Sequence, residues 1–326
     1  MPVLSPEPAR PASPPPAPGH VSILLATFNG ARWLPAQLES LARQSHVDWS
    51  LWVGDDGSGD DTRRIVADFA AGAGRGHEVR LVEGPRQGAA QNFLALLTHP
   101  DLPAGPGRFA ALCDQDDVWL PGKLARALDR LGQKDAARPV IYGAQSLHID
   151  EEGRPVGRSR RPRGPVSLGN AVVQNMVSGH SCVLNPAALA LAREAGRHPG
   201  IAFQDWWLSL LVLAAGGEAL IDEETVLLYR QHGQNVLGAP VGLGALLHRI
   251  GLLFGHDYAR WIAGNLAALR ASPVDLTPEA RAVLDGLSGP AQPGLARLRA
   301  LRRLGVHRQS GLGTALLWLG AVLGRV

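Results

Sequence analysis

Cysteine is scarce in this sequence of 326 residues, which contains only Cys113 and Cys182. Two cysteines can build neither a disulfide framework nor a zinc site, so we expect both to be small buried side chains in a reducing cytoplasm. Aromatic residues make up 5% of the chain, and neither an aromatic stacking motif nor zinc-finger spacing accompanies the basic residues. These features predict that the protein has no nucleic-acid partner.

Long apolar runs are also missing. The longest uncharged one covers residues 310–324, which is shorter than the roughly 18 residues that can span a bilayer. Residues 1–19 are rich in proline and lack the apolar segment of a signal peptide, so we expect a disordered tail. The hydrophobic content of 45% and charged content of 19% are typical of a globular protein. Together these features predict a cytoplasmic location.

What the sequence does contain, between residues 20 and 145, is an alternation of short apolar runs with helix-like segments. This pattern predicts an α/β fold with a Rossmann-like, mostly parallel central sheet flanked by helices. The expected strands are residues 21–26, 50–54, 79–83, 109–113 and 140–142, and the expected helices are residues 33–43, 61–71, 90–97 and 121–131. Ligands of such sheets bind at the carboxyl ends of strands. Polar clusters lie there, at residues 27–29, 55–56 and 114–117.

The rest of the chain divides into a second half at residues 165–240 and a helical extension at residues 241–326. Between the halves, residues 154–163 are rich in arginine and are expected to form a mobile solvated loop; the alternative is a loop that orders over an anionic acceptor. In the extension, leucines recur at helical spacing among arginines: Leu295, Leu298, Leu301 and Leu304. This pattern fits an interfacial anchor on the anionic inner face of the cytoplasmic membrane. It equally fits a helix packed on the domain.

The strongest chemical motif is the acidic segment Asp114-Gln115-Asp116-Asp117, directly after a predicted strand. Carboxylates at alternate positions can converge on one hard cation such as Mn²⁺ or Mg²⁺. Such a cation would bridge the oxygens of a diphosphate and stabilise charge on it. The alternative is an acidic turn that caps a helix beginning at Pro121.

Residues 23–30 (ILLATFNG), 53–62 (VGDDGSGDDT) and 114–117 (DQDD) resemble the family 2 glycosyltransferases of the GT-A fold. The order and spacing of these motifs are most similar to bacterial rhamnosyltransferase-like members. The resemblance covers residues 20–240 and implies a nucleotide-binding half at 20–145 and an acceptor-binding half at 165–240. It also implies a dTDP- or UDP-sugar donor, with rhamnose favoured, and a glycan or lipid-linked saccharide acceptor in cell-surface polysaccharide biosynthesis.

The resemblance assigns expected roles to individual residues of the first half. Ala26 and Phe28 match positions that line the nucleotide base, and Asp56 matches an aspartate that hydrogen-bonds the base. Asp114 and Asp116 match the DxD pair, with Asp114 toward the nucleotide and Asp116 as the direct ligand of Mn²⁺ or Mg²⁺. The alternative for Asp56 is an Asp-rich turn before the next helix.

In the second half, Asp205 matches the position of the family's general base, which usually follows a glutamate and here follows Gln204. Alternatively, Asp205 only stabilises the first turn of a helix over residues 207–215, by about 1 kcal/mol. His232 matches a histidine that approaches the metal or diphosphate, and Arg230 could contact phosphate beside it. Gly179 and His180 fall where the family forms its acceptor pocket.

One metal site and one carboxylate base imply a single in-line displacement, which inverts the anomeric configuration. Two other functions stay open. A sugar-nucleotide pyrophosphorylase would carry a Gly-rich, basic loop after the first strand, where this chain has Thr27-Phe28-Asn29-Gly30-Ala31. A catalytically inactive sugar-nucleotide-binding module would bind the donor without transferring the sugar.

Overall fold

The computed structural model of the protein describes residues 19–159, 161–162, 164–233, 256–287 and 294–325. The predicted disordered tail therefore lies, except for Gly19, outside the described residues. The same holds for residues 234–255, which span the predicted end of the domain and the start of the helical extension.

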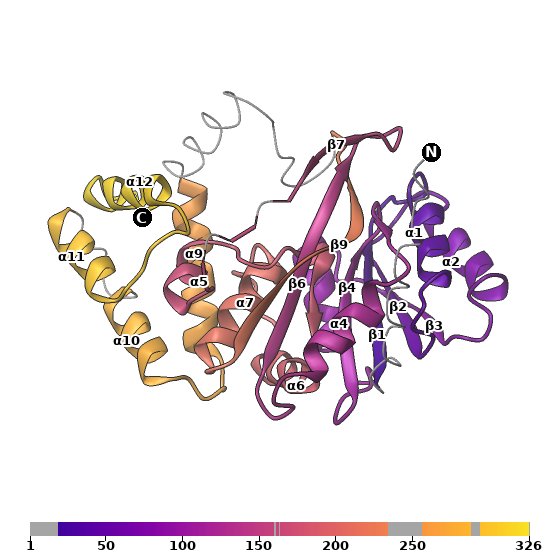
Figure 1. The fold of residues 1–326 in the computed structure, drawn as a ribbon, viewed down its shortest axis with the longest axis horizontal. Coiled ribbons are helices and arrows are strands. Elements are labelled where there is room, and N and C mark those ends of the chain that lie inside the picture. Colours follow the sequence, from indigo (N-terminus) through magenta and orange to yellow (C-terminus); the bar gives the residue numbers. More distant parts are fainter. Residues whose placement is uncertain (1–18, 160, 163, 234–255, 288–293, 326) are drawn as a thin grey trace, which may run out of the picture.

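The first half of the domain, residues 20–145, has the predicted alternating architecture (Figure 1). Its strands are β1 (His20–Thr27), β2 (Trp49–Asp55), β3 (Val79–Glu83) and β4 (Arg108–Asp114). Its helices are α1 (Leu34–Ala42), α2 (Thr62–Ala71), α3 (Ala89–Leu97) and α4 (Lys123–Gly132). The four strands are parallel and lie in the order β3-β2-β1-β4. Their carboxyl ends therefore meet at one edge, as predicted.

Beyond β4 the sheet becomes mixed. The added strands are β5 (Val118–Trp119), β6 (Val140–Ile149), β7 (Pro155–Arg158), β8 (Val183–Leu184) and β9 (Glu218–Arg230). Short β8 pairs antiparallel with both β4 and β6, whereas β9 runs parallel to β6 and antiparallel to β5. The helical segments of this half are α5 (Leu168–Val173), η1 (Gly179–Ser181), α6 (Pro186–Ala195) and α7 (Gln204–Ala214). The parallel pattern thus holds for β1–β4 and for the β6–β9 pair.

Some predicted boundaries differ from the structure. Helix α4 begins at Lys123 instead of residue 121, and α7 begins at Gln204 instead of residue 207. Strand β6 extends to Ile149 because β9 pairs along its whole length. The arginine-rich stretch that we expected to be a loop contains β7, which pairs with β6. Backbone pairing at a sheet edge tolerates the exposed side chains of β7.

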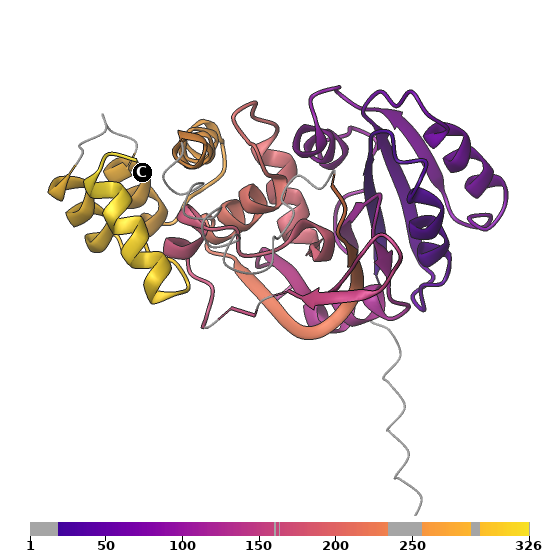
Figure 2. The same ribbon diagram turned by 90° about the horizontal axis from the view of Figure 1, so that it is seen from above.

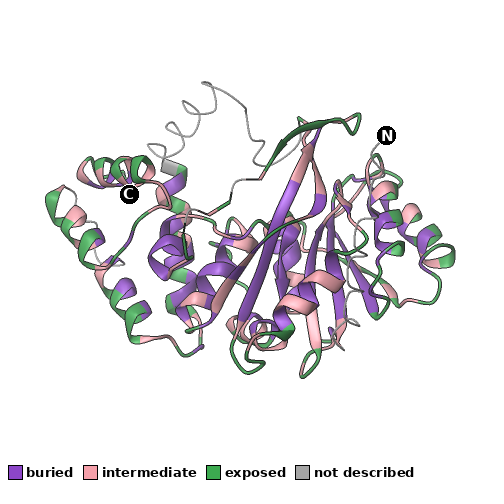
Figure 3. Cartoon of the chain, viewed as in Figure 1, coloured by how far each residue is buried: buried purple, intermediate pink, exposed green. Residues whose placement is uncertain are grey.

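The hydrophobic core lies on both faces of the sheet, and Figure 3 shows the buried strands between partly exposed helices. Alternate residues of β1 face opposite clusters. Leu24 packs with residues of α3, α5, α6 and α7, whereas Ile23 and Leu25 pack with residues of α1 and α4. This burial on both faces explains why β1 is a continuous apolar run.

The C-terminal helices are α9 (His256–Ala271), α10 (Pro278–Leu287), α11 (Leu295–Arg303) and α12 (Gly311–Val322). They gather at the end of the molecule opposite β1–β3 (Figure 2). Leu301, Val306 and Leu317 are buried in the same cluster as α7, so one face of this extension packs on the domain. Leu295, in contrast, is 60% exposed. Among the described residues, no helix has both the length and the apolar composition to cross a membrane.

Candidate functional site

Two loops at the carboxyl edge of the sheet brace each other. Asn29 adopts a left-handed backbone conformation with φ of 48°, which asparagine tolerates better than most residues. Its N–H donates to Oγ of Ser58 at 2.9 Å, and its Oδ1 accepts from the N–H of Gly59 at 2.8 Å. This arrangement holds the loop after β1 in place, and the preceding side chain, Phe28, is 56% exposed.

Gln115, between the two DxD aspartates, ties this loop to the acidic segment. The N–H of Phe28 donates to Oε1 of Gln115 at 3.0 Å, and Nε2 of Gln115 donates to the carbonyl of Phe28 at 3.1 Å. A Cβ atom at Gly30 would clash with the Gln115 amide. Ala26 lies directly opposite Asp114 in the β1–β4 register. The structure therefore brings together Ala26, Phe28 and Asp114, three of the four residues predicted to bind the nucleotide.

Asp56 is buried and holds the turn that leads into α3. Its carboxylate accepts from the N–H of Arg86 at 2.6 Å and from the N–H of Gly88 at 2.7 Å. These bonds give Asp56 a structural role at the same edge of the sheet. Its predicted contact with a nucleotide base stays a prediction.

The acidic segment converges with residues from both halves. Oδ2 of Asp116 lies 2.8 Å from Nε2 of His232, the other predicted metal ligand. Asp117 is fully buried, and its Oδ1 accepts from the N–H of Arg230 at 3.2 Å. Its Oδ2 has no hydrogen-bond partner within the described part of the chain.

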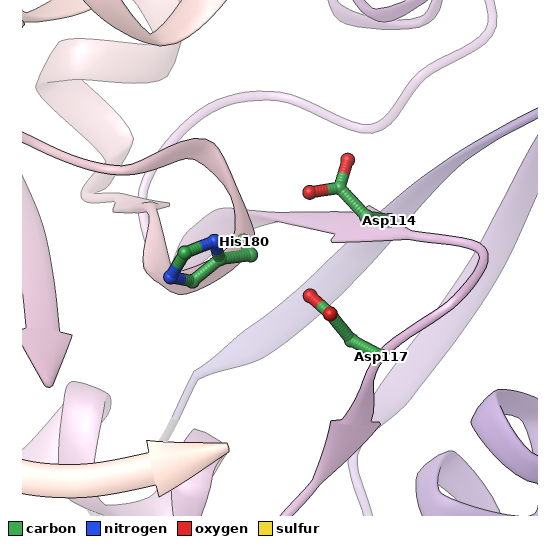
Figure 4. Close-up of side chains that lie close together, drawn as sticks. All are labelled: Asp114, Asp117 and His180. Carbon is green, nitrogen blue, oxygen red and sulfur yellow. The ribbon is translucent and has the colours of Figure 1, made fainter. Parts of the chain in front are cut away.

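A second group of candidate ligands lies beside that pair. Asp114, Asp117 and His180 each offer one ligand atom, and these atoms lie within 4.8 Å of one another. Figure 4 shows the three side chains close together, with Asp114 at the end of β4. Carboxylate oxygens and a neutral imidazole suit a divalent cation. Asp117 was expected only as an alternative metal ligand together with His232, because the sequence of an acidic turn does not distinguish a metal ligand from a helix cap.

The carboxylates of this cluster are close enough to raise one another's pKa values. Burial, together with repulsion from Asp116 and Asp205, raises the pKa of Asp114 to about 7. Burial and the charges of Asp114 and Asp116 raise the pKa of Asp117 well above its usual range. Burial lowers the pKa of His180 to about 3, so its imidazole is neutral near pH 7. A cation placed here would favour the ionised carboxylates.

Asp205 is the second residue of α7 and holds the η1 turn. Its Oδ1 accepts from the N–H of Trp206 at 2.8 Å, and its Oδ2 accepts from the N–H of Gly179 at 2.8 Å. Burial raises the pKa of Asp205, an effect that its hydrogen bonds oppose. A Cβ on Gly179 would come within 3.4 Å of Oδ2 of Asp205. Asp205, Gly179 and His180 therefore lie together, and Asp205 contributes to the first helical turn as well.

Arg230, which was predicted to contact phosphate, binds backbone carbonyl groups of the protein itself. Its guanidinium donates to the backbone carbonyls of Asp116, Asp150 and Glu151 at 3.2–3.3 Å. It also lies over the ring of Trp33, with 4.5 Å between the guanidinium carbon and the ring centroid. Arg230 thus fastens the end of β9 to the acidic segment, and its contact with phosphate stays a prediction.

Lys123, which the sequence did not single out, is completely buried. Its Nζ donates to the carbonyl of His180 at 2.6 Å and lies 3.4 Å from the centroid of the Trp119 ring. A lysine at the start of an amphipathic helix normally reaches solvent, so the sequence contains no signal for this burial.

Comparison with known proteins identifies the domain. Residues 22–179 match the model of the glycosyl transferase family 2. The dTDP-rhamnosyl transferase RfbG of Shigella flexneri is 26% identical over 258 residues, covering 75% of this chain and 84% of that protein. The Escherichia coli UDP-Glc:alpha-D-GlcNAc-diphosphoundecaprenol beta-1,3-glucosyltransferase WfgD is 31% identical over 124 residues. That alignment covers 38% of this chain and 44% of WfgD.

Solved structures show the same fold. Residues 1–349 of Staphylococcus aureus TarS, in complex with UDP-GlcNAc, align with a TM-score of 0.55 and 15% identity over 82% of this chain and 71% of that one. The mannosyltransferase PcManGT of Pyrobaculum calidifontis, in complex with GDP-Man and Mn²⁺, aligns with a TM-score of 0.53 and 20% identity over 96% and 84%. These neighbours are GT-A glycosyltransferases, which confirms the predicted fold class. The chain therefore carries a glycosyltransferase family 2 domain and is a glycosyltransferase with the GT-A fold.

Proposed function

We propose that this protein is an inverting, metal-dependent glycosyltransferase. It transfers a sugar from a nucleotide diphosphate to a hydroxyl of a glycan or lipid-linked saccharide in cell-surface polysaccharide biosynthesis. The observation that carries the proposal is the meeting of Asp205, from the acceptor half, with the carboxylates of the acidic segment. Asp205 accepts from the N–H of Gly179, and the next residue, His180, offers a ligand atom within 4.8 Å of those of Asp114 and Asp117. The carboxylates of the two halves therefore approach one small region, and repulsion from Asp205 accordingly contributes to the raised pKa of Asp114.

The donor that we propose is a dTDP- or UDP-sugar, with rhamnose as the sugar. The name of RfbG supports dTDP-rhamnose, and the TarS complex supports a uridine nucleotide. Ala26, Phe28, Asp56 and Asp114 would contact the nucleoside. The exposed ring of Phe28, on its braced loop, supplies a flat apolar surface for the base.

The residues present fit a divalent cation, Mn²⁺ or Mg²⁺. A buried carboxylate oxygen of Asp117 without a partner among the described residues and a neutral His180 both favour a bound positive charge. We assign Asp116 and His232 as the residues that hold the ion, because Oδ2 of Asp116 and Nε2 of His232 lie only 2.8 Å apart and both side chains retain some solvent exposure. When bound there, the ion stabilises the negative charge of the diphosphate leaving group.

Asp205 would act as the general base. Its carboxylate is oriented by the N–H groups of Gly179 and Trp206, and its raised pKa makes it a stronger base than an ordinary aspartate. It removes the proton of the acceptor hydroxyl as that oxygen bonds to the anomeric carbon. The bond from that carbon to the diphosphate breaks on the opposite side, so the configuration inverts.

The C-terminal helices support peripheral attachment to the inner face of the cytoplasmic membrane. Exposed leucines lie along one face of α12 and at its C-cap. They are 64%, 48% and 57% exposed: Leu312, Leu319 and the C-cap Leu323. The opposite face of α12 is buried at Leu317 and Ala321. Exposed arginines lie on the neighbouring helix α11. An apolar stripe beside cationic side chains suits the surface of an anionic bilayer, where lipid-linked acceptors reside.

Binding and turnover measurements separate this function from its rivals. The family 2 domain leaves the pyrophosphorylase without support, so the inactive binding module is the remaining alternative. We expect UDP or dTDP to raise the melting temperature only with Mn²⁺, since a specific ligand stabilises the folded state. We further expect slow release of the nucleoside diphosphate from a matching donor with water as acceptor. Binding without any release would favour the inactive module.

A further inference from the structure

The chain contains only two lysines, Lys123 and Lys134, and Lys123 has no exposed surface. It is the first residue of α4, where the positive end of the helix dipole disfavours a cation. Burial of an ammonium group also removes its hydration, which costs several kcal/mol unless other groups replace the water. Packing alone does not call for a charge at this position.

Three kinds of group replace the lost hydration of Lys123. The carbonyl of His180 accepts from Nζ at 2.6 Å, and the face of the Trp119 ring lies 3.4 Å away. The charges of Asp114 and Asp117 also act on the ammonium group, although burial outweighs them and lowers its pKa to about 7. Each of these groups belongs to, or adjoins, the site described above.

The hydrogen bond to His180 connects Lys123 to the proposed base. His180 is the middle residue of η1, and its neighbour Gly179 donates its N–H to Oδ2 of Asp205. Lys123 therefore holds one side of this turn while Asp205 holds the other. Because α4 follows the acidic segment after a few residues, the turn is fixed relative to both the DxD aspartates and the base.

We propose that Lys123 is a positioning residue that fastens η1 to the acidic segment and so sets the location of Asp205 relative to the bound donor. This inference rests on the proposed role of Asp205 as the general base. An unbranched apolar side chain would fill the same space without the desolvation cost of an ammonium group. The ammonium group instead provides a directed hydrogen bond to the turn.

The test is Lys123→Met, with Lys134→Met as the matched control. Lys134 follows the same helix and pairs with Glu218 at 2.6 Å, away from the turn. We expect Lys123→Met to keep the Tm of the wild type. Its Mn²⁺-dependent Kd for UDP or dTDP should stay within about threefold of the wild-type value. The kcat for release of nucleoside diphosphate from dTDP-rhamnose, UDP-glucose or UDP-GlcNAc should fall by roughly 10²-fold, as small misplacements of reacting groups do. Lys134→Met should match the wild type.

Several outcomes would overturn the inference. A folded Lys123→Met protein with wild-type kcat would remove Lys123 from any positioning role, and parallel losses of Tm, Kd and kcat would show that it only supports the fold. If the Met variant does not fold, Lys123→Gln retains a donor for the carbonyl of His180 and should recover part of kcat. A folded Gln variant with no turnover contradicts the proposal. A wild-type protein that binds nucleotide but turns over no donor contradicts the proposed function itself.

Discussion

Replacement of Asp205 by asparagine separates its structural role from its proposed catalytic role. As the second residue of α7 it stabilises the first helical turn, and loss of its negative charge there costs only about 0.3–1 kcal/mol. As the proposed base it must accept a proton, which asparagine cannot do. Asp205→Asn should therefore reduce turnover while leaving the helix in place.

The expected magnitudes follow from the contacts of Asp205. Loss of a positioned base lowers kcat by roughly 10²–10⁴-fold, or about 3–5 kcal/mol of transition-state stabilisation. Asparagine can accept only one of the two hydrogen bonds from Gly179 and Trp206, a loss of about 1 kcal/mol. Burial raises the pKa of Asp205, so its ionised form is less favourable in the folded state. Removal of that charge offsets the lost bond, and Tm should change by only about 4 °C or less.

The assay is release of nucleoside diphosphate at saturating donor, alongside calorimetric measurement of nucleotide affinity with Mn²⁺. Asp257→Asn is a matched control, because Asp257 is likewise the second residue of its helix, α9, and lies far along the chain from the site. The control should retain wild-type kcat. A folded Asp205→Asn variant that binds nucleotide and keeps a wild-type kcat would refute the assignment of the base.

Three further results are expected. Asp116→Ala should weaken Mn²⁺-dependent binding of UDP or dTDP at least about 10-fold without unfolding the protein, and unchanged affinity would move the metal to Asp114 and Asp117. The kcat at saturating donor should fall as the pH is lowered through the raised pKa of Asp205. This fall should occur at a higher pH than an ordinary aspartate would give, and the residual activity of Asp205→Asn should not show it. Serine at all three exposed leucines of α12 should weaken binding to phosphatidylglycerol vesicles by roughly 10²-fold, because each half-exposed leucine contributes about 1 kcal/mol; equal flotation of variant and wild type would contradict membrane attachment. The leucines to be changed are Leu312, Leu319 and Leu323.

The fold of residues 20–145 could be predicted from the sequence because the strands of this half are covered on both faces. A strand such as β1 then becomes a continuous apolar run, and each helix starts within two residues of its predicted position. β7 escaped prediction for the opposite reason. Its side chains are all exposed, so only its backbone pairing with β6 defines it. Backbone pairing does not require a particular pattern of residue types, so the sequence does not reveal it.

The candidate site was predictable only where a residue belongs to a motif. Asp114, Asp116, Asp205 and His232 were named from their motifs, and the structure brings Asp116 to His232 and Asp205 to Gly179. Gln115 and Lys123 could not be found in this way. Their roles depend on partners 87 and 57 residues away in the chain, and no local periodicity encodes such contacts.

The position of β9 bears on the order in which the protein assembles. Its last residues pair with β5, and the N–H of Arg230 reaches Asp117 across 113 residues of chain. Closing a loop of that length costs roughly 4 kcal/mol of chain entropy, so this contact is expected to form late. During synthesis β1–β4 can associate first, since domains fold as the chain emerges. The acidic segment then acquires its final conformation only after β9 has been synthesised. A nascent chain that lacks β9 is therefore not expected to form the complete site.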